Sequence, residues 1–222
     1  IPHLGGVGVF GSFALTLLFN FRFSWSLKGV VIASFIIMLS GLWDDVKGLS
    51  ARFRLALQVL CSLLVIWFGV RLNIIPDDIP FAYPLEVAIT VFWIVGITNA
   101  MNFMDGIDGL AGGISFIASC AFFFIALSTG QGYFAFLTIA LAGACLGFLA
   151  FNYPPARIFL GDAGSSFLGF CLASLAVMGE WAENEPIVAF SVPILVLAVL
   201  IFDMIYISVS RIYRKKVSNF KE

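Results

Sequence analysis

Residues 111–128, AGGISFIASCAFFFIALS, and residues 133–151, YFAFLTIALAGACLGFLAF, contain no charged side chain. Each run is close to the roughly 20 residues that a helix needs to cross a bilayer core of about 30 Å. A short polar break, TGQG at 129–132, separates the two runs. They therefore predict a helical hairpin embedded in a membrane.

The composition of the whole chain extends this prediction. Of its 222 residues, 61% are hydrophobic and 11% are charged, whereas about a quarter of the residues in an average soluble domain are charged. The mean hydropathy is +1.06. We expect one polytopic, all-α transmembrane domain over residues 1–222 with about eight spans, at 4–21, 28–43, 53–70, 85–101, 111–128, 133–151, 164–179 and 187–207.

The ends of the sequence suggest a fragment. The chain starts at Ile1 rather than at Met, without the basic and small-residue features of a signal peptide, and it stops within a basic run. We expect the domain to be truncated at both ends.

Cysteine and histidine usage excludes several enzyme classes. The four cysteines lie singly in apolar runs without C-x-x-C spacing, and His3 is the one histidine of the chain. A histidine-based zinc site or a Ser-His-Asp triad cannot be built from these residues.

The distribution of basic residues predicts which loops face the cytoplasm. If eight spans alternate, one set of connections contains nine Lys and Arg residues and the other contains three. Lys and Arg are enriched in cytoplasmic loops, so the first set is assigned to the cytoplasm. Its members are Lys47, Arg52, Arg54, Arg157, Arg211, Arg214, Lys215, Lys216 and Lys221, and the other set is Arg22, Lys28 and Arg71.

Acidic residues sorted by the same alternation form two groups. Six fall on the outer side: Asp77, Asp78, Glu86, Glu180, Glu183 and Glu185. Five aspartates fall on the cytoplasmic side, from three loops: Asp44, Asp45, Asp105, Asp108 and Asp162. Charges near span ends are costly unless they are solvated or functional. The five aspartates therefore predict a site built from three cytoplasmic loops.

The first loop motif is GLWDDVKGLS at 41–50, followed by Arg52 and Arg54. The adjacent carboxylates of Asp44 and Asp45 repel each other unless a cation or basic groups compensate them. A solvated loop that closes a helix is an equally good interpretation of this motif on its own.

The second motif is NAMNFMDGIDGLAGG at 99–113. Residues three apart share a helix face, so Asn99, Asn102 and Asp105 could line one edge. Asp-Gly pairs also form ordinary turns, which is the simpler alternative. The pair is repeated here, at Asp105 and at Asp108, and this repetition favours a functional segment.

The third motif is FNYPPARIFLGDAGSS at 151–166. Asp162 could simply cap the helix that follows. The small residues Gly161, Gly164, Ser165 and Ser166 form a helix entrance whose N–H groups suit a phosphate, and Arg157 is a second anion partner. A carboxylate beside a phosphate site suggests a bridging Mg²⁺.

Together, DDVKGLSARFR, NAMNFMDGIDGLAGG and FNYPPARIFLGDAGSSFLG resemble the three cytoplasmic signatures of the polyprenyl-phosphate N-acetylhexosamine-1-phosphate transferases, a glycosyltransferase family 4 group related to phospho-MurNAc-pentapeptide translocase. The residues of the second and third motifs are more similar to the branch that initiates O-antigen and other surface polysaccharides than to the translocases. Two features differ from the family. It has a preceding helix and a later histidine-containing loop, which this chain lacks, and Gly48 stands where the translocases often have a lysine.

The resemblance implies a reaction. UDP-N-acetylhexosamine and undecaprenyl phosphate would give polyprenyl-pyrophosphoryl-sugar and UMP, with Mg²⁺ as cofactor and Mn²⁺ as a substitute. This would be the first membrane step of lipopolysaccharide or cell-wall polysaccharide synthesis, in the bacterial inner membrane with the site facing the cytoplasm. Nucleic acid is not an expected partner, and a homodimer stays open.

The resemblance also implies roles for residues. Asp162 and Asp105 would bind the metal, and the catalytic carboxylates would be Asp44, Asp45, Asp105 and Asp108. Substrate contacts would come from Asn99, Asn102, Arg52, Arg54, Arg157, Gly161 and Ser165. A lipid phosphate is largely dianionic at pH 7, so we expect direct attack rather than an aspartyl intermediate.

A membrane transporter or lipid-linked-sugar flippase is the main alternative. It predicts charged residues at mid-span, where Asp203 is the one deep candidate. A membrane subunit without chemistry would leave the five cytoplasmic aspartates unexplained.

Overall fold

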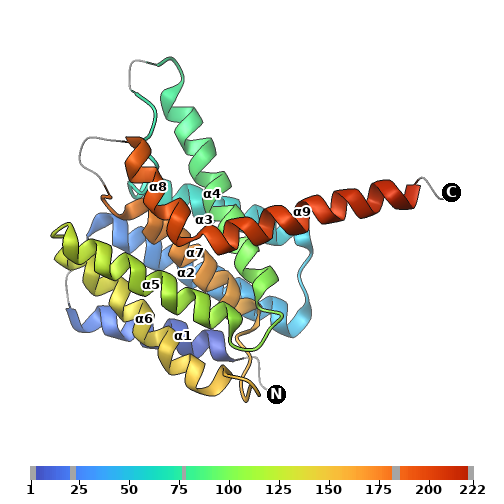
Figure 1. Cartoon of the computed structure of the whole chain (residues 1–222). Helices are drawn as coiled ribbons and strands as arrows, with labels where there is room; N and C mark the ends of the chain where they lie inside the picture. Colours follow the sequence, from blue (N-terminus) through green and yellow to red (C-terminus); the bar gives the residue numbers. More distant parts are fainter. Residues whose placement is uncertain (1–3, 21–23, 77–78, 182–185, 220–222) are drawn as a thin grey trace.

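The computed structural model describes residues 4–20, 24–76, 79–181 and 186–219. His3, Arg22, Asp77, Asp78, Glu183, Glu185 and Lys221 lie outside these ranges. The described residues form nine α-helices and no strand (Figure 1). The helices are α1 (Gly5–Asn20), α2 (Trp25–Lys47), α3 (Ala51–Trp67), α4 (Ala82–Met104), α5 (Leu110–Ser128), α6 (Gly132–Asn152), α7 (Gly161–Met178), α8 (Pro186–Val196) and α9 (Ala198–Asn219).

The all-α, polytopic class predicted from the sequence is confirmed, but the count of eight spans is not. Five of the described helices, α2, α4, α5, α6 and α7, are long and apolar enough to cross a membrane. A bent pair made by α8 and α9 raises the number to six. With 16 and 17 residues, α1 and α3 are shorter than these spans.

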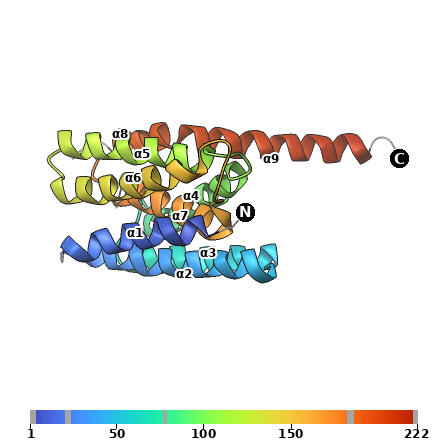
Figure 2. The same cartoon turned by 90° about the horizontal axis from the view of Figure 1, so that it is seen from below.

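The expected span 187–207 differs most from the structure. It is divided between α8 and α9, and the two parts are bent by 72°. Pro193 lies inside α8, one turn before the bend, and a proline lacks the backbone N–H of a regular helix, which is a common cause of sharp bends. As a result, α9 packs across α4 and extends past one end of the bundle (Figure 2).

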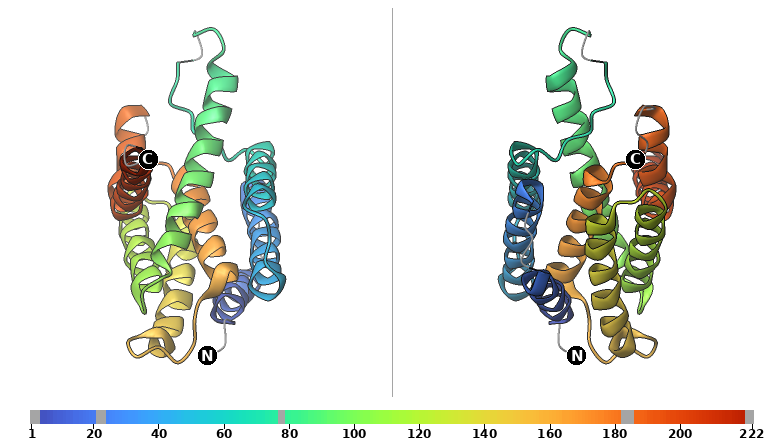
Figure 3. Two further views of the ribbon diagram at one scale, coloured as in Figure 1. Left: turned by 90° about the vertical axis from the view of Figure 1, so that its right-hand side faces the viewer. Right: turned by 90° about the vertical axis from the view of Figure 1, so that its left-hand side faces the viewer.

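The centre of the bundle is α7, which packs against α1, α2 and α4 (Figure 3). In the apolar window of α7, 83% of the residues are buried, compared with 39–56% in the other four spans. Glycines permit this close packing. A Cβ atom on Gly6 of α1 would collide with the backbone of Gly164, and one on Gly41 of α2 would collide with Asp162. Small residues are the usual means by which membrane helices approach closely.

The three loops that contain the motifs lie at the same end of the bundle (Figure 3). These loops join α2 to α3, α4 to α5, and α6 to α7. The N-terminus of α1 is at this end too, because the N–H of Gly5 donates to the carbonyl of Phe159, at 3.0 Å. We call this end the aspartate pole. The fold therefore assembles one site from segments that are far apart in the sequence.

Candidate active site

The first motif is joined directly to the third. Asp45, in the last turn of α2, accepts hydrogen bonds from the backbone N–H of Asp162 at 2.8 Å and from that of Ala163 at 3.1 Å. The carboxylate therefore caps α7 from another helix, where the helix dipole favours an anion. The predicted alternative, in which Asp162 caps α7, is not observed, because Leu160 is at the N-cap position and makes no side-chain cap bond.

The second carboxylate of the first motif is held by an arginine. Arg54 Nη1 lies 2.7 Å from Asp44 Oδ2 and 3.7 Å from Asp162 Oδ2. The other oxygen of Asp44 accepts from the N–H of Leu49 at 2.5 Å. Ser50 caps α3 through the N–H of Phe53 at 3.3 Å, which sets the start of the helix that carries Arg54. One guanidinium thus links carboxylates of two motifs.

The second motif contributes Asp105, which follows the last residue of α4. Burial and, to a smaller extent, the negative charges of Asp162 and Asp45 together raise the pKa of Asp105 to about 7, against a hydrogen bond from Gly161 that lowers it. Three aspartates from three loops are therefore close enough to act on one another. Their convergence, expected from the sequence, is present in the structure.

The donor set fits a divalent cation completed by a substrate. Among the described residues, no group of three or more His, Cys, Asp or Glu side chains is arranged to hold a metal alone. Mg²⁺ usually takes one or two carboxylates, with waters and substrate phosphates as its other ligands. Asp105 and Asp162 are such a pair, because they lie close enough for the negative charge of Asp162 to raise the pKa of Asp105.

Asp108 has a different environment from the other four aspartates. Its Oδ2 accepts from the N–H of Ala156, at 3.0 Å, in the loop between α6 and α7. Beside it, the N–H of Gly109 donates to Asn152 Oδ1 at 2.8 Å, and Asn152 Nδ2 donates to the carbonyl of Ile158 at 2.9 Å. These bonds tie two loops together. The predicted catalytic role of Asp108 is not supported by a contact with the other carboxylates.

Asn152 was not among the residues predicted from the sequence. Its side chain is 5% exposed and forms a hydrogen bond with each of the two loops. Its position at the end of an apolar run, as the second residue of the third motif, is the signal that could have revealed it.

Asn99 and Asn102 were expected on one edge, but they contact different helices. Asn102 lies 3.3 Å from Ser166 Oγ of α7. Asn99 donates to Gln58 Oε1 of α3 at 2.7 Å and to the carbonyl of Val95 at 2.8 Å. Three residues turn a helix by about 300°, so the two amides point about 60° apart on α4, and each meets a different helix packed against α4, α3 or α7. Asn102 stays at the site, whereas Asn99 links α3 to α4.

The remaining predicted substrate residues divide into exposed and buried ones. Arg52 and Arg157 are exposed at the aspartate pole and form no ion pair within the described ranges. Gly161 has φ +75°, a left-handed conformation that favours glycine at the start of α7. Ser165 is fully buried and donates to the carbonyl of Gly161 at 3.0 Å, so its hydroxyl supports the helix start and does not face a ligand.

One further cation, on α9, lies beside the second motif. Arg211 lies 4.9 Å from the centre of the Phe103 ring, next to Asn102. The sequence assigned Arg211 to the cytoplasmic side but did not predict its contact with Phe103, which depends on the bend between α8 and α9. In contrast, Lys47 lies over the ring of Trp43 at 4.8 Å, and no carboxylate partner is found for it among the described residues.

Comparison with known proteins agrees with this geometry. Residues 27–180 match the model of glycosyl transferase family 4. The chain is 34% identical to a probable undecaprenyl-phosphate N-acetylglucosaminyl 1-phosphate transferase of Bacillus subtilis, over 97% of this chain and 62% of that protein. It is 42% identical to a phospho-N-acetylmuramoyl-pentapeptide-transferase of Moorella thermoacetica, over 59% of this chain and 44% of that protein.

A third relative is a decaprenyl-phosphate N-acetylglucosaminephosphotransferase of Mycobacterium tuberculosis, which is 35% identical over 82% of this chain and 52% of that protein. The chain thus spans between 44% and 62% of the length of these relatives. The family model covers all three loop motifs. The chain is a multi-pass membrane protein, and it belongs to glycosyl transferase family 4.

Proposed function

We propose that this domain transfers N-acetylhexosamine-1-phosphate from a UDP-sugar to undecaprenyl, or another polyprenyl, phosphate. One observation supports this above all: Asp45, Asp105 and Asp162, from three separate loops, meet at one end of a membrane-embedded bundle. The names of the relatives, which are transferases acting on polyprenyl phosphates or on a phospho-sugar peptide, support the same reaction class.

The reaction exchanges one phosphate bond for another. An oxygen of the polyprenyl phosphate attacks the sugar-linked phosphorus, and the bond from that phosphorus to the bridging oxygen breaks, so that UMP leaves. The acceptor has a second pKa of about 6 and needs little help from a base. Phosphoryl transfer then depends mainly on positioning and on neutralising charge.

The described side chains suit these two tasks. Asp162 and Asp105 would hold Mg²⁺, or Mn²⁺ in its place, and the ion would neutralise phosphate oxygens. Arg54 forms an ion pair with Asp44 at 2.7 Å, and this carboxylate would accept a residual proton from the acceptor. Arg52 and Arg157, both exposed, would attract the anionic substrates. Asp45 holds the first turn of α7, and with it Asp162, in position.

We further propose that the aspartate pole faces the cytoplasm from a bacterial inner membrane. The loops at this pole and the helix ends beside them carry four basic residues, Lys47, Arg52, Arg54 and Arg157. Basic residues accumulate on the cytoplasmic side of membrane proteins. A UDP-sugar would reach the site from that side. The product would be the first lipid-linked intermediate of an envelope polysaccharide.

Transport without covalent chemistry is the second candidate. Asp203, the deep charge that would favour it, lies half-buried in α9 and forms no ion pair in the described part of the chain. The carboxylates that interact are at the end of the bundle instead, where transfer chemistry needs them.

The deciding experiment measures UMP release by membranes that contain the protein, with a UDP-N-acetylhexosamine and polyprenyl phosphate. Asp162→Asn and Asp105→Asn should each abolish Mg²⁺-dependent release, because each removes a metal ligand. Glu180→Gln is the matched control, since this exposed side chain is at the opposite end. Normal turnover by either aspartate variant would reject the site, and uptake of the UDP-sugar without UMP release would favour transport.

A further inference from the structure

A glutamine of α3 is buried one helical turn inside the aspartate pole. Gln58 is 4% exposed, and its Oε1 accepts a hydrogen bond from Asn99 Nδ2 of α4 at 2.7 Å. A buried amide is costly unless it is hydrogen-bonded, and this bond offsets that cost. Because a hydrogen bond is directional and apolar contact is not, the bond also fixes the rotation of α3 against α4.

Gln58 lies on the same face of α3 as Arg54. The two residues are four positions apart, so their side chains are neighbours along the helix, separated by a rise of about 6 Å. Arg54 Nη1 lies 2.7 Å from Asp44 Oδ2 and 3.7 Å from Asp162 Oδ2. A rotation of α3 that broke the bond between Gln58 and Asn99 would therefore also move the guanidinium away from these carboxylates.

Two further side chains complete the connection between the helices. Asn102, three residues after Asn99 on α4, lies 3.3 Å from Ser166 Oγ of α7. Helix α4 packs against both α3 and α7. Each of the three helices thus supplies two side chains to a closed ring of contacts, which consists of Arg54 and Gln58, Asn99 and Asn102, and Asp162 and Ser166.

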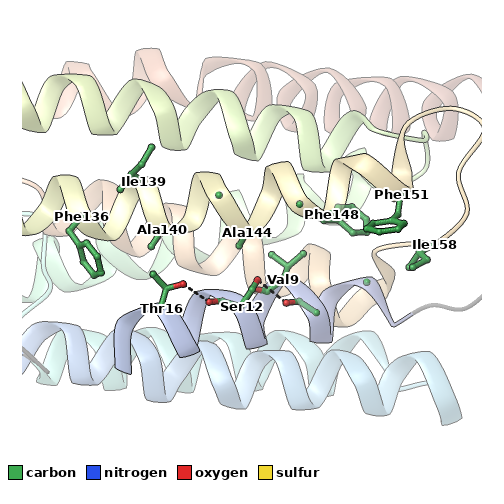
Figure 4. A pocket seen from close by; sticks show the side chains of 14 residues that line it. Val9, Ser12, Thr16, Phe136, Ile139, Ala140, Ala144, Phe148, Phe151 and Ile158 are labelled. Atoms are coloured by element: carbon green, nitrogen blue, oxygen red, sulfur yellow. Dashed lines mark hydrogen bonds between the residues drawn. The ribbon is translucent and has the colours of Figure 1, made fainter. Parts of the chain in front are cut away.

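Several other hydroxyls of the bundle bond only within their own helix. Along the open groove between α1 and α6, Ser12 donates to the carbonyl of Gly8 at 2.9 Å, and Thr16 donates to that of Ser12 at 2.8 Å (Figure 4). On α3 itself, Ser62 donates to the carbonyl of Gln58 at 2.8 Å. Such bonds do not constrain how two helices are rotated against each other, whereas the contacts of the ring do.

Helix α3 depends on its side chains for this constraint more than α7 does. A Cβ atom on Gly169 of α7 would lie 2.8 Å from the Cα atom of Thr98, so direct backbone approach already fixes α7 against α4. Helix α3 contains no glycine. Of its buried side chains, Gln58 is the nearest to the aspartate pole, so this amide is placed where it controls the start of the helix.

We propose that Gln58 is a positioning residue for the transfer reaction and that it acts through Arg54. Its hydrogen bond with Asn99 sets the rotation of α3, and this rotation holds the guanidinium between Asp44 and Asp162. The proposal deepens the proposed function and rests on it. An apolar side chain at position 58 would fill the same space but would not fix the rotation of the helix.

The first test removes the hydrogen bond and keeps the volume. In Gln58→Leu, Asn99 retains its second acceptor, the carbonyl of Val95 at 2.8 Å, so the variant should fold. We expect kcat for UMP release to fall about threefold to tenfold, as for the loss of one hydrogen bond between membrane helices. The KM for the UDP-sugar should stay at the wild-type value. A wild-type kcat would overturn the proposal.

A double-mutant cycle tests whether Gln58 acts through Arg54. In a protein that already carries Arg54→Gln, the addition of Gln58→Leu should lower kcat by less than about twofold, because the guanidinium is absent. A general loss of folded enzyme would instead lower kcat by the same factor in both backgrounds. Equal factors would therefore reject the positioning role.

Exchange of the two amides is the rescue experiment. Gln58→Asn shortens one side chain by a methylene group, and Asn99→Gln lengthens its partner by one. Each single variant should lower kcat, and the double variant should recover most of the loss. A double variant no more active than the single variants would show that the bond between the amides is not what supports turnover.

Two control variants remove hydrogen bonds that lie outside the ring. Ser62→Ala removes the intrahelical bond of α3 and should keep the wild-type kcat. Trp93→Phe removes the bond from Trp93 Nε1 of α4 to the carbonyl of Ala173 of α7, at 3.2 Å. It should lower the unfolding midpoint and keep kcat per folded molecule. A fall in kcat equal to that of Gln58→Leu in either control would contradict a specific role of the ring.

Hydrogen exchange separates this proposal from the proposed function. Residues 51–58 should exchange faster in Gln58→Leu than in the wild type, whatever reaction the protein catalyses. Faster exchange in a protein that releases no UMP would reject the transfer reaction, and with it the role of Gln58, but not the tie between α3 and α4. Unchanged exchange and a wild-type kcat, in a protein that does release UMP, would reject the role of Gln58 alone.

Discussion

The carboxylate of Asp45 binds the first turn of α7 at the backbone N–H of Asp162, over a distance of 2.8 Å. The two residues are 117 positions apart in the chain, and the bond joins the end of α2 to the start of α7. The sequence predicted that phosphate would use these N–H groups. In the structure Asp45 already uses them, so phosphate binds at this helix start only if that carboxylate is displaced.

Replacing Asp45 should therefore affect stability as well as activity. Asp45→Ala removes a helix cap, which typically costs about 0.5–2 kcal/mol, and it also frees α7 to shift relative to Asp105. We expect a lower midpoint of thermal unfolding in detergent and a fall in UMP release. Ser50→Ala, which removes the cap of α3, should lower the midpoint similarly with a smaller effect on turnover. An unchanged midpoint for Asp45→Ala would contradict the capping role.

Arg54 should matter more than the other arginine of its helix turn. Arg54→Gln leaves Asp44, with 7% side-chain exposure, facing Asp162 without a cation between them. We expect kcat to fall at least about tenfold, since breaking a partly buried pair leaves a carboxylate uncompensated. Arg54→Lys should retain part of the activity because it keeps the charge.

Arg52→Gln is the comparison for this prediction. Its exposed side chain forms no ion pair in the described ranges, so its loss should raise the KM for the UDP-sugar modestly and leave kcat near the wild-type value. A larger loss of kcat in Arg52→Gln than in Arg54→Gln would show that the bridge between Asp44 and Asp162 is not functional.

The pKa of Asp105, raised to about 7 by burial and by its acidic neighbours, predicts how metal dependence changes with pH. A metal ligand must lose its proton before it binds. Below pH 7, the Mg²⁺ concentration that gives half-maximal UMP release should therefore increase, by up to about tenfold per pH unit for one proton. Steady-state assays at fixed substrate concentration between pH 5.5 and 8 would measure this Mg²⁺ concentration. A value that does not change with pH would contradict the prediction.

The same shift has the opposite sign for stability without metal. The folded protein retains a proton on Asp105 up to pH near 7, whereas the unfolded chain loses it near 3.8. Between these values the native state binds more protons, so stability falls as pH rises. The unfolding midpoint in EDTA should decrease from pH 5 to pH 8 in the wild type and less in Asp105→Asn, and added Mg²⁺ should reverse the decrease.

Asn152 should hold the second and third motifs together. Asn152→Ala leaves the N–H of Gly109 and the carbonyl of Ile158 without their partner, at roughly 1–3 kcal/mol for a buried unsatisfied group. We expect faster hydrogen exchange in residues 105–109 and 153–160, together with reduced turnover. Gln131→Ala is the control.

The control breaks an equivalent contact at the other end of the bundle. Gln131 Oε1 accepts from the N–H of Glu180 at 3.0 Å. Loss of this hydrogen bond should speed hydrogen exchange near Glu180. It should leave hydrogen exchange at the aspartate pole and the rate of UMP release unchanged. Unchanged exchange in both motif loops of Asn152→Ala would exclude the tie between them.

Much of this protein could be predicted from short stretches of its sequence. Apolar runs of about 20 residues indicate membrane helices, and Asp105 and Asp162 at the ends of such runs indicate a site, because charges are rare there. Counting Lys and Arg by loop then assigns the aspartates to one side. Each of these properties depends on composition within one segment or on simple alternation, so no knowledge of packing is needed.

The pairing of residues depends instead on how the helices are rotated and packed. In α6, apolar residues surround the whole helix, so no stripe in the sequence shows which face meets α1. That Asp45 caps α7, that Asp108 binds a loop, and that α8 and α9 bend by 72° follow from contacts between distant segments. In a membrane, lipid and protein interior are equally apolar, so close packing decides which helix faces meet. The hydrophobic pattern of the sequence therefore does not show these contacts.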